Sequence, residues 1–147
     1  MAIKNELGIN ELVQIFIDDS KFLKDYESAE KIINNEKHNY NTARKVSTEK
    51  TNIIKKLLST ENGVNALTEL LKNDDLVIVS SAAEVLYPLY PKMCIEILKN
   101  YSKSLSNKLD RYKVDCMIEG YIKKQEFFIN NLKKLYNTEN LESLNRE

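Results

Sequence analysis

The chain has 147 residues, of which 42% are hydrophobic and 30% are charged, a composition typical of a globular domain. Lysine plus arginine equals aspartate plus glutamate at 22 each, so no overall field favours nucleic acid or a membrane surface. Three glycines and two prolines are too few for the turns of a β-sandwich or barrel, and they favour long helices joined by short loops.

The first predicted helix follows a flexible N-terminus over residues 1–8. Asn10 is placed to cap it, with Ile9 as the apolar staple before the cap. Asp18, Asp19 and Lys21 are expected on its solvent-facing side. Its core positions are Leu12, Ile15, Phe16, Phe22 and Leu23, with Tyr26 near the end. The polar residues 27–39 either extend this helix or form a connector.

A second helix is predicted from about Tyr40 to Leu58. Its apolar stripe recurs at the helical period, with the stem of Lys50 along the seam. The stripe consists of Ala43, Val46, Ile53, Ile54 and Leu57. Residues 59–63 are predicted to end the helix, with Gly63 as the breaker, and a third helix covers 64–72.

Residues 76–87 read as a strand at first sight, because Leu76-Val77-Ile78-Val79 is a run of apolar residues. Alternation of apolar and polar residues does not continue through Ser80 to Leu86, whereas a helical period does. It gathers Ile78, Val79, Ala82, Ala83 and Leu86 on one arc. We therefore predict a helix that begins after the Asn73-Asp74-Asp75 turn, whose acids suit a helix N-terminus, and that Pro88 limits.

The C-terminal part is predicted to contain two or three more helices. Pro91 suits the first turn of a helix over 92–101. A sixth helix runs from about Asn107 to Lys123 and a seventh from about 125 to 136, and the sequence leaves open whether the two are continuous. Residues 137–147 are a polar tail. The fold class predicted is all-α, with six to seven helices.

An internal repeat relates the middle of the chain to its C-terminal part. Residues 66–73 (ALTELLKN) align with 93–100 (MCIEILKN) at a period of 27. At a period of 34, the arc from Ile78 to Leu86 aligns with Tyr112, Cys116, Met117 and Gly120. The pattern predicts two stacked helical hairpins.

The arrangement of Asp74, an apolar residue, two small residues and then Leu86 resembles the second helix of a HEAT repeat, with Val79 where such repeats usually carry Arg. The order of elements over 11–123 resembles the small bacterial DUF2019-type family of unknown function. The stretches that carry this likeness are NYNTARKVSTEKTNIIKKLL (39–58), ALTELLKNDDLVIVSSAAEVLYPLYPKMCIEIL (66–98) and YKVDCMIEGYIK (112–123). The resemblance implies one HEAT-like α-α superhelix over 9–136 and a bacterial, immunity-like or antitoxin-like role.

No residue pattern predicts catalysis, a cofactor or a metal site. His38 is the only histidine, which excludes multi-histidine metal sites, and its polar surroundings predict an exposed side chain. Asp18 and Asp19 point roughly 100° apart on a helix, so they are no natural acid–base pair. Three scattered glycines form no phosphate loop. Cys94 and Cys116 fit no metal spacing and are predicted to be small core residues. We therefore expect a protein that is not an enzyme.

The function predicted is binding and blocking of another protein, such as a toxin. The motif leaves Val77, Ser80, Ser81 and Glu84 facing outward, and Arg44 and Lys45 are expected to flank them. Against a basic nuclease, the acidic first helix (Glu11, Asp18, Asp19, Asp25) would be the binding face. The alternative is nucleic-acid binding through Lys103, Lys108 and Arg111 in the basic segment 99–113. No signal segment and no long apolar run is seen, so we expect a cytoplasmic protein without membrane contact. The oligomeric state is not predicted.

Overall fold

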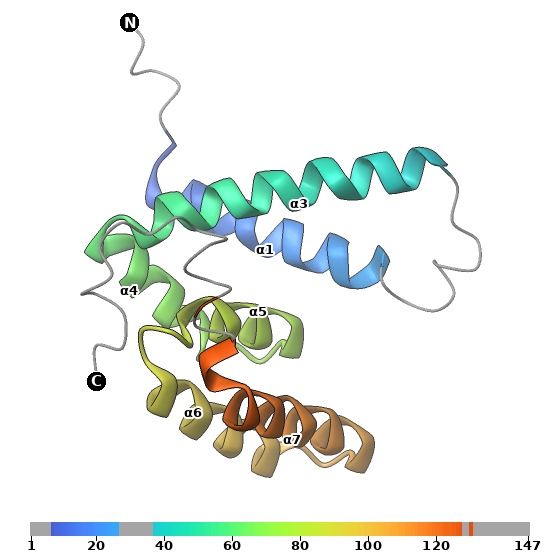
Figure 1. Ribbon diagram of the computed structural model, residues 1–147, viewed down its shortest axis with the longest axis vertical. Helices are drawn as coiled ribbons and strands as arrows, with labels where there is room; N and C mark the ends of the chain where they lie inside the picture. Colours follow the sequence, from blue (N-terminus) through green and yellow to red (C-terminus); the bar gives the residue numbers. More distant parts are fainter. Residues whose placement is uncertain (1–6, 27–36, 128–129, 131–147) are drawn as a thin grey trace, which may run out of the picture. The chain divides into compact units, whose positions relative to one another are not determined.

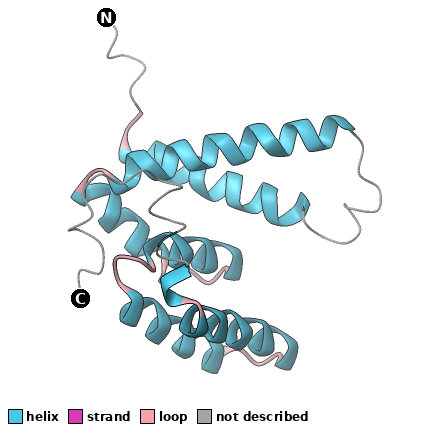
Figure 2. Cartoon of the chain, viewed as in Figure 1, coloured by secondary structure: helices cyan, strands magenta, loops and turns pink. Residues whose placement is uncertain are grey.

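The computed structural model describes residues 7–26, 37–127 and 130, and these residues form helices and loops with no strand among them (Figures 1 and 2). The helices are α1 (Ile9–Tyr26), α3 (Lys37–Leu58), α4 (Glu61–Leu70), α5 (Leu76–Leu86), α6 (Pro91–Ser104) and α7 (Lys108–Lys123). The predicted all-α class is confirmed. The chain divides into two compact units, residues 1–81 and 82–147. The prediction of one HEAT-like domain over 9–136 stays a prediction.

Some predictions concern residues that the structure does not describe. Residues 1–6 of the N-terminus, residues 27–36 of the polar segment and the tail 137–147 lie outside the described part. The remaining residues of the polar segment, 37–39, belong to α3. The seventh helix is described only at 125–127 and 130, and a turn at Lys124 separates 125–127 from α7. None of the described helices has the length and apolar character needed to cross a membrane.

The first unit is built on α1 and α3, which lie side by side (Figure 1). Leu12 and Phe16 of α1 are buried, and so are four of the predicted α3 positions: Ala43, Ile53, Ile54 and Leu57. The Lys50 ammonium lies 5.5 Å from the centre of the Phe16 ring, so its stem follows the seam as predicted. Fully burying a side chain such as Phe16 stabilises a fold by roughly 1.5–3 kcal/mol, so this seam is a main contributor to the unit.

Two predictions for α1 are wrong. Asn10 is not its cap, because the Leu12 amide already donates to the Gly8 carbonyl at 3.0 Å and the helix begins at Ile9. Phe22 is not a core residue, since its side chain is 39% exposed. Phe22 lies six residues after Phe16, which places it well off the face that carries Leu12 and Phe16.

The turn between α3 and α4 corrects the assignment of Gly63. The prediction made this glycine a helix breaker, but α3 ends at Leu58 and α4 already begins at Glu61. Thr60 is the N-cap, and its hydroxyl accepts the Gly63 amide at 3.0 Å. Gly63 is buried inside α4, where a Cβ atom would overlap the backbone of Leu57. The glycine is needed because the two helices approach closely there.

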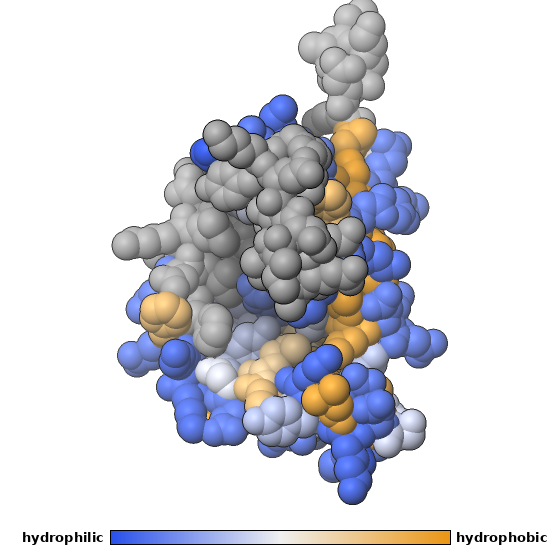
Figure 3. Space-filling view, turned by 90° about the vertical axis from the view of Figure 1, so that its right-hand side faces the viewer, coloured by the Kyte–Doolittle hydropathy of each residue, from blue (hydrophilic) through white to orange (hydrophobic). Residues whose placement is uncertain are grey.

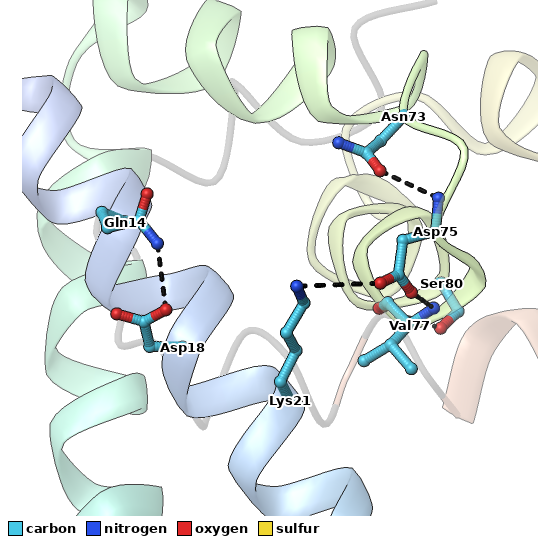
Figure 4. A network of polar contacts seen from close by, with 7 residues as sticks. All are labelled: Gln14, Asp18, Lys21, Asn73, Asp75, Val77 and Ser80. Atoms are coloured by element: carbon cyan, nitrogen blue, oxygen red, sulfur yellow. Dashed lines mark hydrogen bonds and ion pairs between the residues drawn. The ribbon is translucent and has the colours of Figure 1, made fainter.

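The segment that resembled a strand is α5, as the helical period predicted. Ile78, Val79, Ala82, Ala83 and Leu86 are all at most 5% exposed. The turn before α5 is held by side chains (Figure 4). The Asp75 amide donates to Asn73 Oδ1 at 2.8 Å, and the Val77 amide donates to Asp75 Oδ1 at 2.9 Å. Asp75 therefore caps α5, which confirms the predicted role of this turn.

We expect Asp75→Ala to lower the free energy of unfolding by about 1–2 kcal/mol, because the α5 cap is lost. Asp75 also lies 3.8 Å from the Lys21 ammonium, and both side chains are about half exposed. Such an ion pair contributes about 0–1 kcal/mol, so Lys21→Ala is the matched control and should cost clearly less. Urea unfolding of the two variants measures this. Equal losses would show that the ion pair, and not the cap, carries the effect.

The second unit is built on α6 and α7, which pack against each other. Pro91 occupies the first turn of α6, as predicted, and the Asn107 side chain caps α7. Within the unit, the Ser102 hydroxyl donates to Asp115 Oδ1 at 2.8 Å. The buried side chains along the two helices include Cys94, Leu98, Val114, Ile118 and Tyr121.

The second half of the predicted repeat is in the wrong register by one residue. At the predicted period of 34, Tyr112 and Cys116 would be buried, but Tyr112 is 66% exposed and Cys116 is exposed. The buried residues Val114, Ile118 and Tyr121 lie 35 residues after Val79, Ala83 and Leu86. Cys116 is therefore not a core residue, whereas Cys94 is. The first half of the repeat keeps its period, since Leu67 and Leu71 are buried like Cys94 and Leu98, 27 residues later.

Candidate functional site: a groove along helix α6

The predicted partner-binding residues lie on two helices. On α5, Val77, Ser80 and Ser81 are half-buried, and the Ser80 hydroxyl donates to the Val77 carbonyl at 3.2 Å. Glu84 on the same helix is exposed, as are Arg44 and Lys45 on α3. The described contacts include no hydrogen bond or ion pair that joins Arg44 or Lys45 to α5. The prediction that these six residues form one site stays a prediction.

The predicted phosphate-binding residues lie on either side of the turn between α6 and α7. Lys103 lies in the last turn of α6, Lys108 opens α7, and Arg111 follows one turn later. Both lysines are exposed and Arg111 is half-buried. The same stretch carries Asp110, which reduces its positive charge. The turn forms a basic edge of the second unit.

A groove of about 460 Å³ opens along the outward face of α6 in the second unit. We call it the α6 groove. Five of its residues lie on α6, and the others come from the turn before α6, from the end of α7 and from just beyond it. Its lining consists of Tyr87, Pro91, Lys92, Ile95, Glu96, Lys99, Ile122 and Gln125. This volume is within the usual range for binding pockets.

Two stacked tyrosines support the floor of the groove. The rings of Tyr87 and Tyr121 lie 4.7 Å apart at an interplanar angle of 18°. The Tyr87 hydroxyl donates to the Tyr121 carbonyl at 3.0 Å, so it is already used. Burial raises the pKa of both hydroxyls, and the charge of Glu84 adds to the rise at Tyr121. Both tyrosines therefore stay neutral and give the groove a rigid apolar base.

The rim of the groove is charged and its wall is apolar. Lys92, Glu96 and Lys99 are exposed on α6, which gives the rim a net charge of +1. Ile95 is half-buried between them, and Ile122 from α7 is 55% exposed. On another face of the molecule, Figure 3 shows apolar residues in orange beside hydrophilic residues in blue. Such a rim and wall fit an apolar side chain with carboxylates beside it.

Sequence reasoning missed this groove. Lys92, Ile95 and Lys99 recur at the helical period and could have been recognised as one outward face of α6. The contributions of Tyr87 and Ile122 could not be recognised, because they depend on how α7 packs against α6. The partner-binding surface was predicted instead on the outward face of α5.

A buried carboxylate lies between α1 and α3, far from the solvent-facing position predicted for it. Asp19 is 7% exposed, and its Oδ2 atom has no hydrogen-bond partner; neither has the hydroxyl of buried Ser20. Burial, more than any other cause, raises the pKa of Asp19 to about 7. A hydrogen bond to Glu49 and the charges of Glu49 and Asp18 contribute to this rise in pKa, and the charge of Lys50 opposes it. The correction follows from position: Asp19 lies three residues after Phe16 on the packed face.

Asp19 and its neighbour Glu49 do not make a metal site. Among the described residues, no three His, Cys, Asp or Glu side chains gather as a metal site requires. His38 lies in α3, but its side chain is outside the described residues. Of the four acidic residues predicted to form a binding face on α1, Asp19 is buried, whereas Glu11, Asp18 and Asp25 are exposed.

Comparison of the chain with protein-family models, with curated proteins and with solved structures finds no match. The α6 groove is therefore interpreted from its own geometry.

Proposed function

We propose that this protein is a non-catalytic interaction module that binds a partner protein through the α6 groove. The observation that carries the proposal is that Lys92 and Lys99 line one groove together with Ile95, Ile122 and Tyr87, the last of which stacks on Tyr121. Aromatic and aliphatic surface bordered by cations is the composition of a protein-binding hot spot. The neutral tyrosines offer contact area and no acid–base chemistry.

The partner segment that fits the groove carries an apolar side chain flanked by aspartate or glutamate. The apolar side chain would be desolvated between Ile95 and Ile122, and the carboxylates would meet the lysines of the rim. Glu96 lies on the same rim and would disfavour a segment with uniform negative charge. In the immunity-like role that the sequence resemblance implies, the bound segment would border the active site of a toxin, and binding would cover that site.

Photo-crosslinking tests where the partner binds. A benzophenone amino acid placed at Ile95 should form a crosslink to the partner in cells, because this side chain lines the groove. The same group at Lys45, exposed on α3, is the matched control and should give no crosslink. A crosslink from position 45 but not from 95 would contradict the groove and favour the face predicted from sequence.

The purified pair then allows a quantitative test by titration calorimetry. Ile95→Asp and Lys99→Glu should each weaken binding at least about tenfold, the loss expected for truncating or reversing a hot-spot residue. Lys103→Glu, a charge reversal one turn beyond the groove on the same helix, should have less than about a twofold effect. Salt-dependent binding of an oligonucleotide that only Lys103→Glu abolishes would support the nucleic-acid alternative and overturn the proposal.

A further inference from the structure

The outer side of helix α3 is positively charged and carries no apolar side chain. The helix contains six lysine and arginine residues and a single glutamate. The stem of Lys50 follows the seam with α1, whereas the residues opposite the buried stripe are all exposed. We call this side the basic face of α3. It consists of Asn41, Arg44, Lys45, Thr48, Asn52, Lys55 and Lys56.

The positive charge of the basic face is not neutralised by neighbouring carboxylates. Within the described part of the chain, none of its four cations forms an ion pair. Glu49 lies at the edge of the face, and its side chain hydrogen-bonds Asp19 of α1. The face therefore has a net charge of +4, or +3 with Glu49 included, although the charges of the whole chain sum to zero.

The four cations of the basic face form two pairs. Arg44-Lys45 and Lys55-Lys56 are 11 residues apart in sequence. This interval is about three helical turns, so the pairs point in the same direction and lie about 16 Å apart along α3. The major groove of B-DNA is about 12 Å wide, so each pair can reach one of the two strands that border it. Thr48 between the pairs carries a hydroxyl, a group that also contacts phosphate and sugar oxygens.

The composition of the basic face distinguishes among polyanionic partners. The centre of a protein interface is enriched in aromatic side chains, a membrane-binding helix has an apolar face, and single-stranded nucleic acid stacks on aromatic rings. The basic face has none of these side chains. Duplex RNA has a deep, narrow major groove, which does not fit the wide spacing of the two pairs. Duplex DNA fits best, because its phosphates are bound by lysine and arginine.

We propose that the basic face of α3 binds the backbone of double-stranded DNA, with Arg44-Lys45 on one strand of the major groove and Lys55-Lys56 on the other. The contacts are made to phosphates, so binding does not depend on base sequence. The basic face belongs to the first unit and the α6 groove to the second. DNA binding therefore does not depend on the function proposed for the groove.

Fluorescence anisotropy of the full chain with a labelled DNA duplex of about 20 base pairs tests the binding. Four phosphate contacts predict that the logarithm of the binding constant falls with the logarithm of the salt concentration at a slope of about −3.6. The affinity should therefore drop roughly 100-fold between about 50 and 200 mM NaCl. A duplex of unrelated sequence should bind within about twofold of the first. No binding at the lower salt concentration, or a slope near zero, would overturn the proposal.

Removal of charge locates the binding surface. The double variant Lys55→Gln, Lys56→Gln should reduce the salt slope by about two and weaken binding at least about tenfold at the same salt concentration. The double variant Lys24→Gln, Lys124→Gln is the matched control, because it removes the same charge from exposed positions outside the basic face. It should leave the slope unchanged. Equal losses in the two double variants would show a general effect of charge and contradict a site on α3.

Two further measurements decide between this site and its competitors. If Lys103→Gln with Lys108→Gln abolishes DNA binding and the α3 variant does not, the DNA lies on the basic edge between α6 and α7 and the proposal is wrong. Competition with an RNA duplex of the same sequence and with poly-glutamate tests the partner. Both should compete less well than unlabelled DNA, and equal or better competition by either one would replace DNA as the occupant of the basic face.

Discussion

Replacing Gly63 with alanine should lower the free energy of unfolding by about 1–2 kcal/mol, although alanine is the better helix former. Intrinsic propensity alone would favour the alanine by about 1 kcal/mol in a helix interior. At Gly63, however, the added methyl group would overlap the carbonyl group and the Cα of Leu57, where α3 ends. Overpacking costs about 1–3 kcal/mol, and a backbone segment moves aside less readily than a side chain. The steric effect should therefore exceed the propensity gain.

Gly120→Ala is the matched control, since Gly120 is also inside a helix but has open space around it. There the propensity gain should appear unopposed, as a stabilisation of about 0.5–1 kcal/mol. Both substitutions should be measured by urea unfolding. If both substitutions change the free energy of unfolding in the same direction, the inference that α3 and α4 approach closely at Gly63 is wrong.

The helices and most of their buried faces could be predicted because both depend on local periodicity. The arc from Ile78 to Leu86 and the stripe from Ala43 to Leu57 recur at the helical period, and burial follows them. Capping by Asp75 and Asn107 is also local, because each side chain binds amides two or three residues away. Such features need no knowledge of the neighbouring helix.

The errors occur where residue type was given more weight than position. Asp19 was assigned to solvent because it is charged, yet its spacing from Leu12 and Phe16 places it on the packed face. Cys116 was assigned to the core because it is small, and this shifted the repeat by one residue from the buried set of α7. The role of Gly63 and the α6 groove depend on contacts between helices, which the periodicity of one helix does not contain.

Stability should fall as pH rises from about 4 to above 7, and Asp19→Asn should remove most of this fall. The pKa of Asp19 is raised from 3.8 to about 7 in the folded protein. Between these values the folded state keeps its proton and the unfolded state has lost it, so raising the pH favours unfolding. The stabilisation is complete below the pKa of Asp19 in the unfolded state, and it is lost as the pH rises through the pKa of Asp19 in the folded state. A shift of this size corresponds to roughly 4 kcal/mol over the whole range.

Urea unfolding of wild type and Asp19→Asn at pH 5 and pH 8 provides the measurement. We compare the free energy of unfolding of Asp19→Asn with that of the wild type at each pH. The difference should be roughly 2–4 kcal/mol larger, in favour of the variant, at pH 8 than at pH 5, because asparagine stays neutral at both values. Asp18→Asn is the matched comparison: Asp18 is exposed and accepts a hydrogen bond from Gln14 at 2.9 Å (Figure 4). Its charge is one of the smaller causes of the raised pKa of Asp19, so this variant should keep most of the pH dependence of the wild type. Parallel pH profiles for wild type and Asp19→Asn would refute the raised pKa.

A substitution at the neighbouring Glu49 distinguishes the two main causes of the raised pKa of Asp19. Burial is the larger cause, and the hydrogen bond and charge of Glu49 come after it. Glu49→Gln removes the charge on α3 but leaves Asp19 between the packed helices. We therefore expect this variant to keep most of the pH dependence and to shift its midpoint to lower pH. Complete loss of the dependence would mean that repulsion between the two carboxylates, and not the desolvation of Asp19, sets its protonation in the seam of α1 and α3.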